Sequence, residues 1–147
     1  MRCDWHSMEQ LKECYQDLTN AINSLFRAIK KFNNLHCDNE SEEYKTLCES
    51  EIKRFEICVD TLWKYLKLYL EIKKGMIQTS PKPVFRECLR AQIISDEKDI
   101  AFAIKMVDAR NLATHIYKEE VADLIHAQIA DHYVLMTKFL AAAKPID

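Results

Sequence analysis

Residues that break helices are almost absent from this chain of 147 residues. Glycine occurs once, at Gly75, and proline occurs three times, at Pro81, Pro83 and Pro145. Glycine and proline are the residues that most strongly interrupt regular structure. Because they are confined to one central region and the C-terminal end, the rest of the chain has room for long helices.

Apolar residues recur at helical spacing before the central break. The first helix is expected to begin near Ser7, with Gln10 completing a capping box. Its apolar face consists of Leu11, Tyr15, Leu18, Ile22, Leu25, Ile29 and Phe32. A second helix is expected to follow the candidate caps Asp38, Asn39 and Ser41 and to end near Gly75. Its apolar positions are Leu47 or Cys48, Ile52, Phe55, Val59, Leu62, Leu66 and Tyr69.

Three further helices are predicted after the break. Ser80 and Pro81 are typical of a helix start, and this short helix should reach about Ile93. Asp96 can cap the fourth helix, and the fifth should start near Lys118. The apolar positions of the last two are Ile100, Ala103, Ile104 and Val107, then Ala122, Ile125, Ile129, Tyr133, Met136 and Leu140. We therefore expect one all-α domain over residues 1–147, an up-and-down four-helix bundle with an additional short helix.

Composition excludes several classes of protein. Apolar residues make up 48% and charged residues 30%, and no apolar run approaches the roughly 20 residues that cross a bilayer. Residues 1–9 do not resemble a signal peptide, so we expect a cytoplasmic protein. The six cysteines form no C-x-x-C pair and should be reduced. The net charge of -2 means that any contact with RNA must come from a local patch.

The segment 108–117 contains an unusual set of polar residues. On a continuous helix, Arg110 would share the core-facing stripe of Ala103 and Val107. A cation there needs a carboxylate, a polar cavity or an anionic ligand. Arg110 and His115 would lie roughly 140° apart on a straight helix. Either the helix ends between them, or a second subunit completes the site.

A purely structural interpretation is also open for this segment. Arg110 could pair with a carboxylate in the core, and His115 could cap a helix end. The candidate partners are Asp60, Asp108 and Asp123. Tyr117 could pack its ring inward and leave its hydroxyl in water.

Residues 110–117, with the sequence RNLATHIY, match the R-N-x-x-x-H-x-Y motif of the HEPN superfamily. Further segments resemble the nucleotidyltransferase substrate-binding branch of that superfamily. They are Arg54-Phe55-Glu56, Leu62-Trp63-Lys64, Leu66-Lys67, Ser80-Pro81-Lys82, Phe85-Arg86 and the run from Ala91 to Asp96. Together these segments extend the resemblance over roughly residues 8–140.

This resemblance implies a HEPN-like four-helix core, a homodimer and a minimal nucleotidyltransferase partner. Some members of the superfamily are toxins that cleave RNA without a metal, and in others the partner transfers AMP to the motif tyrosine. Mapped by motif, His115 would be a general acid or base, Arg110 would stabilise the phosphate transition state, and Tyr117 would accept AMP. The nucleotidyltransferase would then be the antitoxin.

The residue types suit this chemistry independently of the resemblance. Cleavage of RNA through its own 2′-hydroxyl requires two proton transfers and stabilisation of charge on phosphate. Histidine titrates near neutral pH, and arginine holds phosphate oxygens without losing its charge. Asn111 could contact the phosphate or orient His115. Because a single histidine offers few catalytic groups for two proton transfers, we expect a dimer that brings two copies of the site together.

Other candidate features are weaker. Lys82, Arg86 and Arg90 recur every four residues and form either a basic ridge for phosphates or a solvated face. The histidines outside the motif show no metal-binding pattern, so we predict no metal and no cofactor. An alternative function is a non-catalytic subunit that binds a substrate or nucleotide for the nucleotidyltransferase. A helical interaction module without a site is the third interpretation.

Overall fold

The computed structural model describes residues 5–35, 41–114 and 119–146, and all regular elements in these ranges are helices. In chain order they are α1 (Trp5–Asn33), α2 (Glu42–Tyr69), the π-helical turn η1 (Leu70–Lys74), α3 (Pro81–Arg90), α4 (Glu97–Ala113) and α5 (Glu119–Ala142). The predicted all-α class is therefore confirmed.

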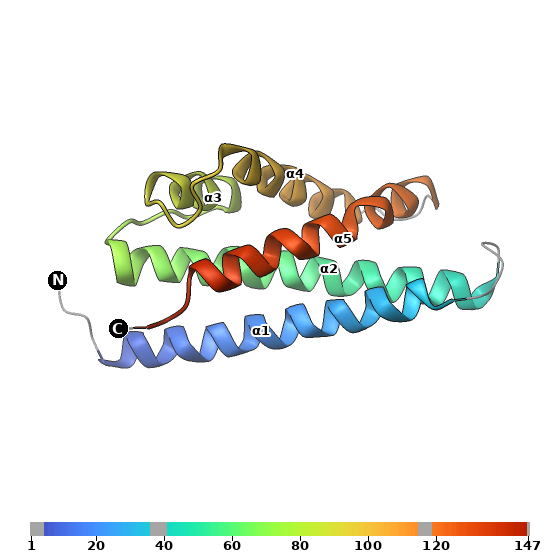
Figure 1. Cartoon of the computed structure of the whole chain (residues 1–147), viewed down its shortest axis with the longest axis horizontal. Helices are drawn as coiled ribbons and strands as arrows, with labels where there is room; N and C mark the ends of the chain where they lie inside the picture. Colours follow the sequence, from blue (N-terminus) through green and yellow to red (C-terminus); the bar gives the residue numbers. More distant parts are fainter. Residues whose placement is uncertain (1–4, 36–40, 115–118, 147) are drawn as a thin grey trace.

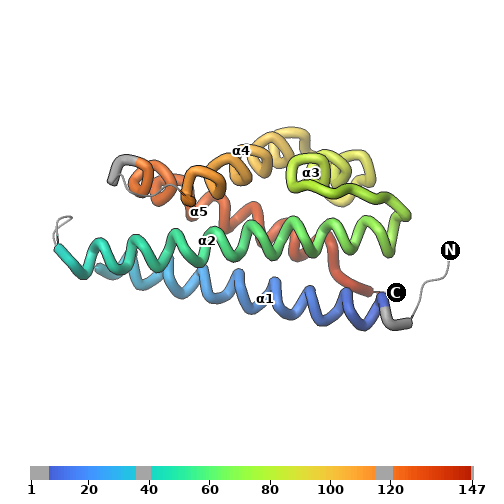
Figure 2. Tube along the Cα trace, turned by 180° about the vertical axis from the view of Figure 1, so that it is seen from behind, coloured from blue at the N-terminus to red at the C-terminus, as the bar shows by residue number. Residues whose placement is uncertain are grey.

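The four long helices alternate in direction along the bundle (Figure 1). α1 and α2 run antiparallel, α4 and α5 do the same, and the short α3 lies beside the start of α4. α2 packs against α1, α3, α4 and α5, and the view from behind shows α2 between α1 and the layer of α3 and α4 (Figure 2). This arrangement confirms the predicted up-and-down bundle with an additional short helix. None of the helices in the described ranges is long and apolar enough to span a membrane.

Several helix ends lie where the sequence predicts them. The Ser41 hydroxyl accepts a hydrogen bond from the Tyr44 backbone N–H at 3.1 Å, and the Asp96 carboxylate accepts one from Lys98 at 2.9 Å. Gly75 adopts a left-handed conformation with φ of 66°, which glycine does without steric cost. These caps fix the start of α2, the start of α4 and the end of η1.

Two predicted boundaries are wrong. Ser7 lies inside α1, which already includes Trp5, so Ser7 does not cap this helix. α3 ends at Arg90 rather than near Ile93, because Gln92 takes a positive φ of 60°. The Ile93 N–H then bonds to the Cys88 carbonyl at 2.9 Å, which is the hydrogen bond of a Schellman motif. Ser80 does occupy the N-cap position of α3, although its side chain makes no capping bond there.

The core follows the predicted faces of α1 and α2 and differs on α5. On α1, the predicted residues Leu11, Leu18, Ile22, Leu25 and Ile29 are buried, with Tyr15 and Phe32 partly buried at the margin. On α5, the predicted residues Ala122, Tyr133 and Leu140 are only partly buried, and the buried set is Ile125, Ile129, His132, Leu135, Met136 and Phe139, with Ala143 directly after the helix. The difference arises at His132, a polar residue that occupies the core position for which apolar periodicity predicts the neighbouring Tyr133.

His132 is completely buried among aromatic rings. Its ring stacks on Phe102 with centroids 4.5 Å apart and lies 5.4 Å from the ring of Phe55. Neither ring nitrogen has a hydrogen-bond partner among the described residues. Because burial penalises the charged imidazolium, the pKa of His132 falls to about 4.

Replacement of His132 by leucine should therefore flatten the dependence of stability on acid pH. The pKa of His132 is about 4 in the folded protein against 6.5 for the free side chain, so its neutral form favours folding above pH 6.5 and this contribution is lost as the pH falls toward 4. Between pH 7 and pH 5, the wild type should lose about 2 kcal/mol more of its free energy of unfolding than His132→Leu. Urea denaturation at both pH values measures the difference. Equal losses in the two proteins would contradict the assignment.

Candidate functional site

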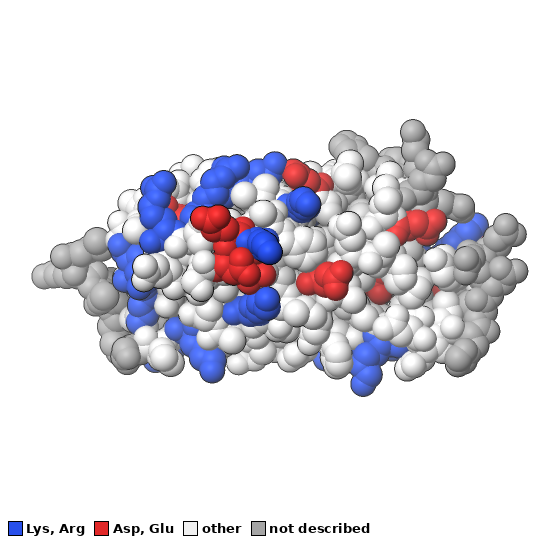
Figure 3. Space-filling model, turned by 45° about the horizontal axis from the view of Figure 1, so that its top comes forward, with Lys and Arg blue, Asp and Glu red and all other residues white. Residues whose placement is uncertain are grey.

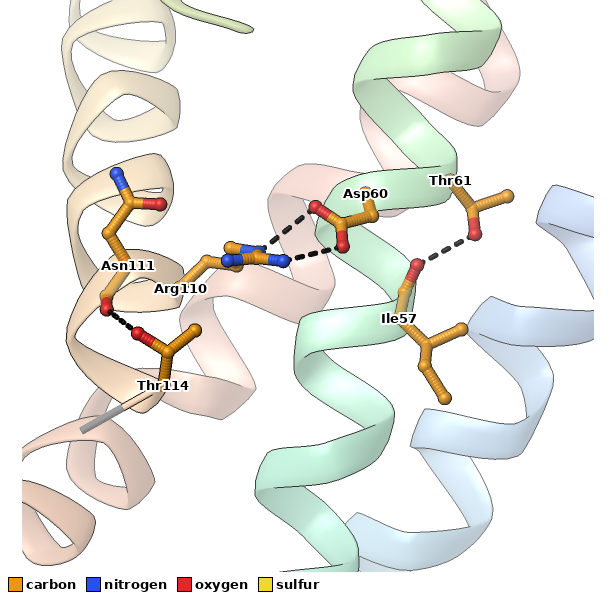
Figure 4. A network of polar contacts seen from close by, with 6 residues as sticks. All are labelled: Ile57, Asp60, Thr61, Arg110, Asn111 and Thr114. Atoms are coloured by element: carbon orange, nitrogen blue, oxygen red, sulfur yellow. Dashed lines mark hydrogen bonds and ion pairs between the residues drawn. The ribbon is translucent and has the colours of Figure 1, made fainter. Parts of the chain in front are cut away.

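The last turn of α4 directs Arg110 toward α2. The Arg110 Nε atom donates to Asp60 Oδ1 at 2.9 Å, and a terminal guanidinium nitrogen donates to Asp60 Oδ2 at 2.8 Å (Figure 4). This is the two-point geometry in which arginine binds carboxylates most specifically. The pair fixes the direction of the Arg110 side chain and joins two helices that are far apart in the sequence.

Asp60 holds Arg110 in place, and the Arg110 side chain remains partly exposed to solvent. Its side chain is 27% exposed and that of Asp60 is 35% exposed. The hydrogen bonds from Arg110 to Asp60 raise the pKa of the guanidinium, and the charge of Glu56 adds to this effect. A guanidinium carries five N–H donors, so the two bonds to Asp60 leave donors for another anion. Arg110 is thus a permanent, oriented and partly accessible cation.

The structure distinguishes between the interpretations of Arg110. Of the three candidate carboxylates, Asp60 is the partner, while Asp108 pairs with Lys82 at 2.6 Å. α4 ends at Ala113, so the helix does end between Arg110 and His115. His115 itself lies outside the described residues.

Of the other motif residues with a predicted role, Asn111 lies in the described part of the chain. Asn111 is exposed, and its side chain points away from Asp60 (Figure 4). Its backbone carbonyl accepts a hydrogen bond from the Thr114 hydroxyl at 2.8 Å. Tyr117 lies outside the described residues. The proposed roles of Asn111, His115 and Tyr117 therefore remain predictions.

A small cavity lies between α1 and α2, next to the Arg110–Asp60 pair. Its volume is about 200 Å³, and its lining consists of Cys14, Asp17, Asp60, Thr61, Lys64 and Tyr65. Asp60 thus contacts Arg110 and also borders this cavity. Nearby, the Thr61 hydroxyl is bonded to the Ile57 carbonyl at 2.7 Å (Figure 4).

The predicted basic ridge on α3 is partly neutralised by neighbouring acids. Lys82 bonds to Asp108 of α4, and Arg90 lies 3.5 Å from Glu87. Arg86 is exposed. Lysine and arginine gather at this end of the molecule, with red carboxylates beside them (Figure 3). The arrangement leaves Arg86 as the ridge residue without a carboxylate partner in the described ranges.

A further ionic pair, between His126 and Glu51, was not predicted from the sequence. His126 Nδ1 of α5 lies 2.5 Å from Glu51 Oε1 of α2, and the Glu51 side chain is completely buried. This hydrogen bond raises the pKa of His126, whose ring also packs on Phe32 at 3.9 Å between centroids. The available signal was the position of Glu51, which falls on the apolar stripe between Cys48 and Phe55. A carboxylate on such a stripe requires a partner from another helix.

The remaining candidate groups are the possible metal ligands and the cysteines, and in the described residues their roles are structural. Among the described residues, no group of histidines, cysteines and carboxylates is arranged to hold a metal ion. Cys14, Cys48, Cys58 and Cys88 are free thiols. Burial raises the pKa of Cys58 and of Cys88 to about 12, so both stay protonated and unreactive at neutral pH.

Comparison with known proteins identifies the class of this helical bundle. Residues 13–144 match the model of the family described as nucleotidyltransferase substrate binding protein like. The chain belongs to this family. A comparison with curated proteins found no match.

Two solved structures share the fold. A protein of Thermus thermophilus is 28% identical, with a TM-score of 0.73, over 86% of this chain and 98% of that one. A chain of a toxin-antitoxin solved with AMP-PNP is 21% identical, with a TM-score of 0.66, over 86% of this chain and 97% of that one. The second likeness concerns the fold alone.

A double-mutant cycle should detect the coupling between Arg110 and Asp60. We expect Arg110→Gln and Asp60→Asn to show a coupling of about 1 kcal/mol, a modest value because both side chains are partly exposed. Urea denaturation of the wild type, both single variants and the double variant measures it.

The pair formed by Lys138 and Asp99 provides a matched control. Its closest contact is 3.3 Å, and the lysine side chain is 51% exposed, so its coupling should be smaller. Equal coupling in the two cycles would show that the two-point geometry of Arg110 adds nothing to stability.

Proposed function

We propose that this chain is a cytoplasmic, HEPN-type toxin subunit that cleaves RNA without a metal and is neutralised by a nucleotidyltransferase antitoxin. The observation that carries this proposal is Arg110, a partly accessible cation held by Asp60 at the start of the RNLATHIY motif. The family match over residues 13–144 supports a nucleotidyltransferase as the partner. The toxin-antitoxin structure with the same fold is consistent with such a pair.

The proposed reaction uses the 2′-hydroxyl of RNA as the nucleophile. The 2′-oxygen attacks the adjacent phosphorus, the bond from phosphorus to the 5′-oxygen breaks, and the products carry a 2′,3′-cyclic phosphate and a 5′-hydroxyl. His115 transfers a proton, either from the 2′-hydroxyl or to the leaving oxygen. Arg110 stabilises the charge on the phosphate through its free N–H donors, and Asn111 contacts the phosphate or orients His115.

A homodimer would supply the second proton-transfer group that one chain lacks. Two large apolar side chains flank the connection between α4 and α5, with Leu112 52% exposed and Leu124 69% exposed. Exposed apolar groups within the motif, at Leu112, and shortly after it, at Leu124, favour a surface that a partner covers. Two copies of His115 would then serve the two proton transfers.

A non-catalytic subunit is the second candidate function. In that case the same surface binds a nucleotide or presents a substrate to the nucleotidyltransferase, and no RNA is cleaved. The net charge of -2 and the substrate-binding description of the family favour this alternative.

Incubation of the purified protein with total RNA in a chelator should yield fragments with cyclic phosphate ends. His115→Ala should lower the rate at least about a hundredfold, because general acid-base catalysis typically contributes 10²–10⁴. Arg110→Lys keeps the charge but loses the planar fork, and it should lower the rate by about tenfold or more.

Lys105→Gln provides a control on the exposed face of α4 and should retain the wild-type rate. Absence of cleavage by wild-type protein with an unmodified Tyr117 would overturn the ribonuclease proposal in favour of the binding subunit.

The regulatory part of the proposal concerns Tyr117. Incubation with the cognate nucleotidyltransferase, ATP and magnesium should join the α-phosphate of ATP to the Tyr117 hydroxyl with release of pyrophosphate. The product should carry the mass of one adenylate group and should no longer cleave RNA. Tyr117→Phe should gain no mass and should still cleave RNA in the presence of the partner. Intact-protein mass spectrometry measures the modification, and a gain of mass in Tyr117→Phe would exclude Tyr117 as the acceptor.

A further inference from the structure

A second cavity lies between the C-terminal half of α1 and the N-terminal half of α2, two segments that lie side by side (Figure 2). Its volume is about 140 Å³, and its lining consists of Ser24, Arg27, Ala28, Lys31, Leu47, Ser50 and Arg54. It shares no lining residue with the cavity next to Asp60. The cavity is therefore separate from the Arg110 site.

Positive charge dominates the lining of this cavity. Arg27 and Lys31 lie one turn apart on α1, and Arg54 faces the same cavity from α2. No carboxylate belongs to the lining, and none of the three cations pairs with a carboxylate in the described ranges. Like charges around one hollow repel each other, so an anion between them would relieve this repulsion. Lys82, Arg90 and Arg110 each pair with a carboxylate, whereas the three cations of this cavity have no such partner among the described residues.

The hydrogen-bond donors and the volume of the cavity restrict which anion it can bind. The two guanidinium groups of Arg27 and Arg54 can each donate two parallel hydrogen bonds to phosphate oxygens, and the Ser24 and Ser50 hydroxyls add further donors. Pockets for drug-sized ligands begin at about 300 Å³, so a cavity of about 140 Å³ accepts a phosphoryl group but not a whole nucleotide. A ligand larger than phosphate would have to leave its remaining atoms outside.

We propose that this cavity binds a phosphoryl group, held by Arg27, Lys31 and Arg54. The group is either free phosphate or the phosphate of a nucleotide, because the lining recognises charge and oxygen geometry and offers no large apolar wall for a base. This site does not depend on Arg110, and it would exist whether or not the protein cleaves RNA.

NMR titration of the labelled full-length protein tests the proposal at constant ionic strength, with inorganic phosphate replacing chloride. Saturable shifts should appear in the amides of residues 24–31 and 47–54. Arg54→Gln and Arg27→Gln should each weaken binding by about tenfold or more, because each removes a charged hydrogen-bond donor. No saturable shift in these segments of the wild type would overturn the proposal.

Lys53→Gln is the matched control, because Lys53 is exposed, adjoins Arg54 and lies outside the lining. It changes the net charge equally and should leave phosphate binding unchanged. If Lys53→Gln and Arg54→Gln weakened phosphate binding equally, the effect would come from net charge alone. That result would contradict a defined site. Thermal melts of each variant confirm that it is folded.

Two further probes distinguish the source of the phosphoryl group. AMP should shift the same amides as phosphate, whereas adenosine should not; equal binding of adenosine would contradict recognition through phosphate. An RNA oligonucleotide without terminal phosphates should bind here only if backbone phosphates are accepted. Binding of the oligonucleotide without any binding of phosphate or AMP would overturn a site for a single phosphoryl group.

Discussion

The rest of the structure depends on the burial of α2, because this helix packs against α1, α3, α4 and α5. The Glu51 side chain is completely buried and cannot reach water, and that of Asp60, 35% exposed, reaches it only in part. Glu51 and Asp60 therefore need partners from other helices, and they bind His126 of α5 and Arg110 of α4. These two bonds fix the positions of α4 and α5 along α2. The orientation of Arg110, the first residue of the motif, is thus a consequence of how the bundle accommodates Asp60.

The Glu51–His126 pair and the Arg110–Asp60 pair differ in how far their charges are exposed to solvent. The Glu51 side chain is completely buried, and its Oε2 atom has no hydrogen-bond partner among the described residues. The His126 side chain is 27% exposed, so the burial cost falls mainly on Glu51, and its attraction to His126 offsets that cost only in part. Both side chains of the Arg110–Asp60 pair are partly exposed, so both charges keep some contact with water. Of the two, only the second suits the binding of an external anion.

Sequence periodicity predicts the long helices. It also places Arg110, one member of the Arg110–Asp60 pair, on a core-facing stripe. The apolar face of α1 and the caps Ser41, Gly75 and Asp96 follow from local rules, because each depends on neighbours a few residues away. Arg110 on a core-facing stripe required a carboxylate, a polar cavity or an anionic ligand, and only the packing of α4 on α2 shows that Asp60 is the partner. The Glu51–His126 pair joins residues 75 positions apart, and periodicity carries no information on such a contact. The same limit applies to the cavity between Arg27 and Arg54, which requires two helices to be placed side by side.

Asp60 has two opposing effects on a ligand of Arg110. By holding the guanidinium through two hydrogen bonds, it removes the rotamer freedom that a ligand would otherwise have to restrict, and this preorganisation favours binding. Its negative charge also lies beside the place where a phosphate would sit, and at short range this repulsion opposes binding. The balance depends on whether phosphate approaches the free N–H donors from the side opposite Asp60. An arginine oriented by a carboxylate in this way binds a planar or tetrahedral oxyanion at a defined angle, which a lysine at the same position could not do.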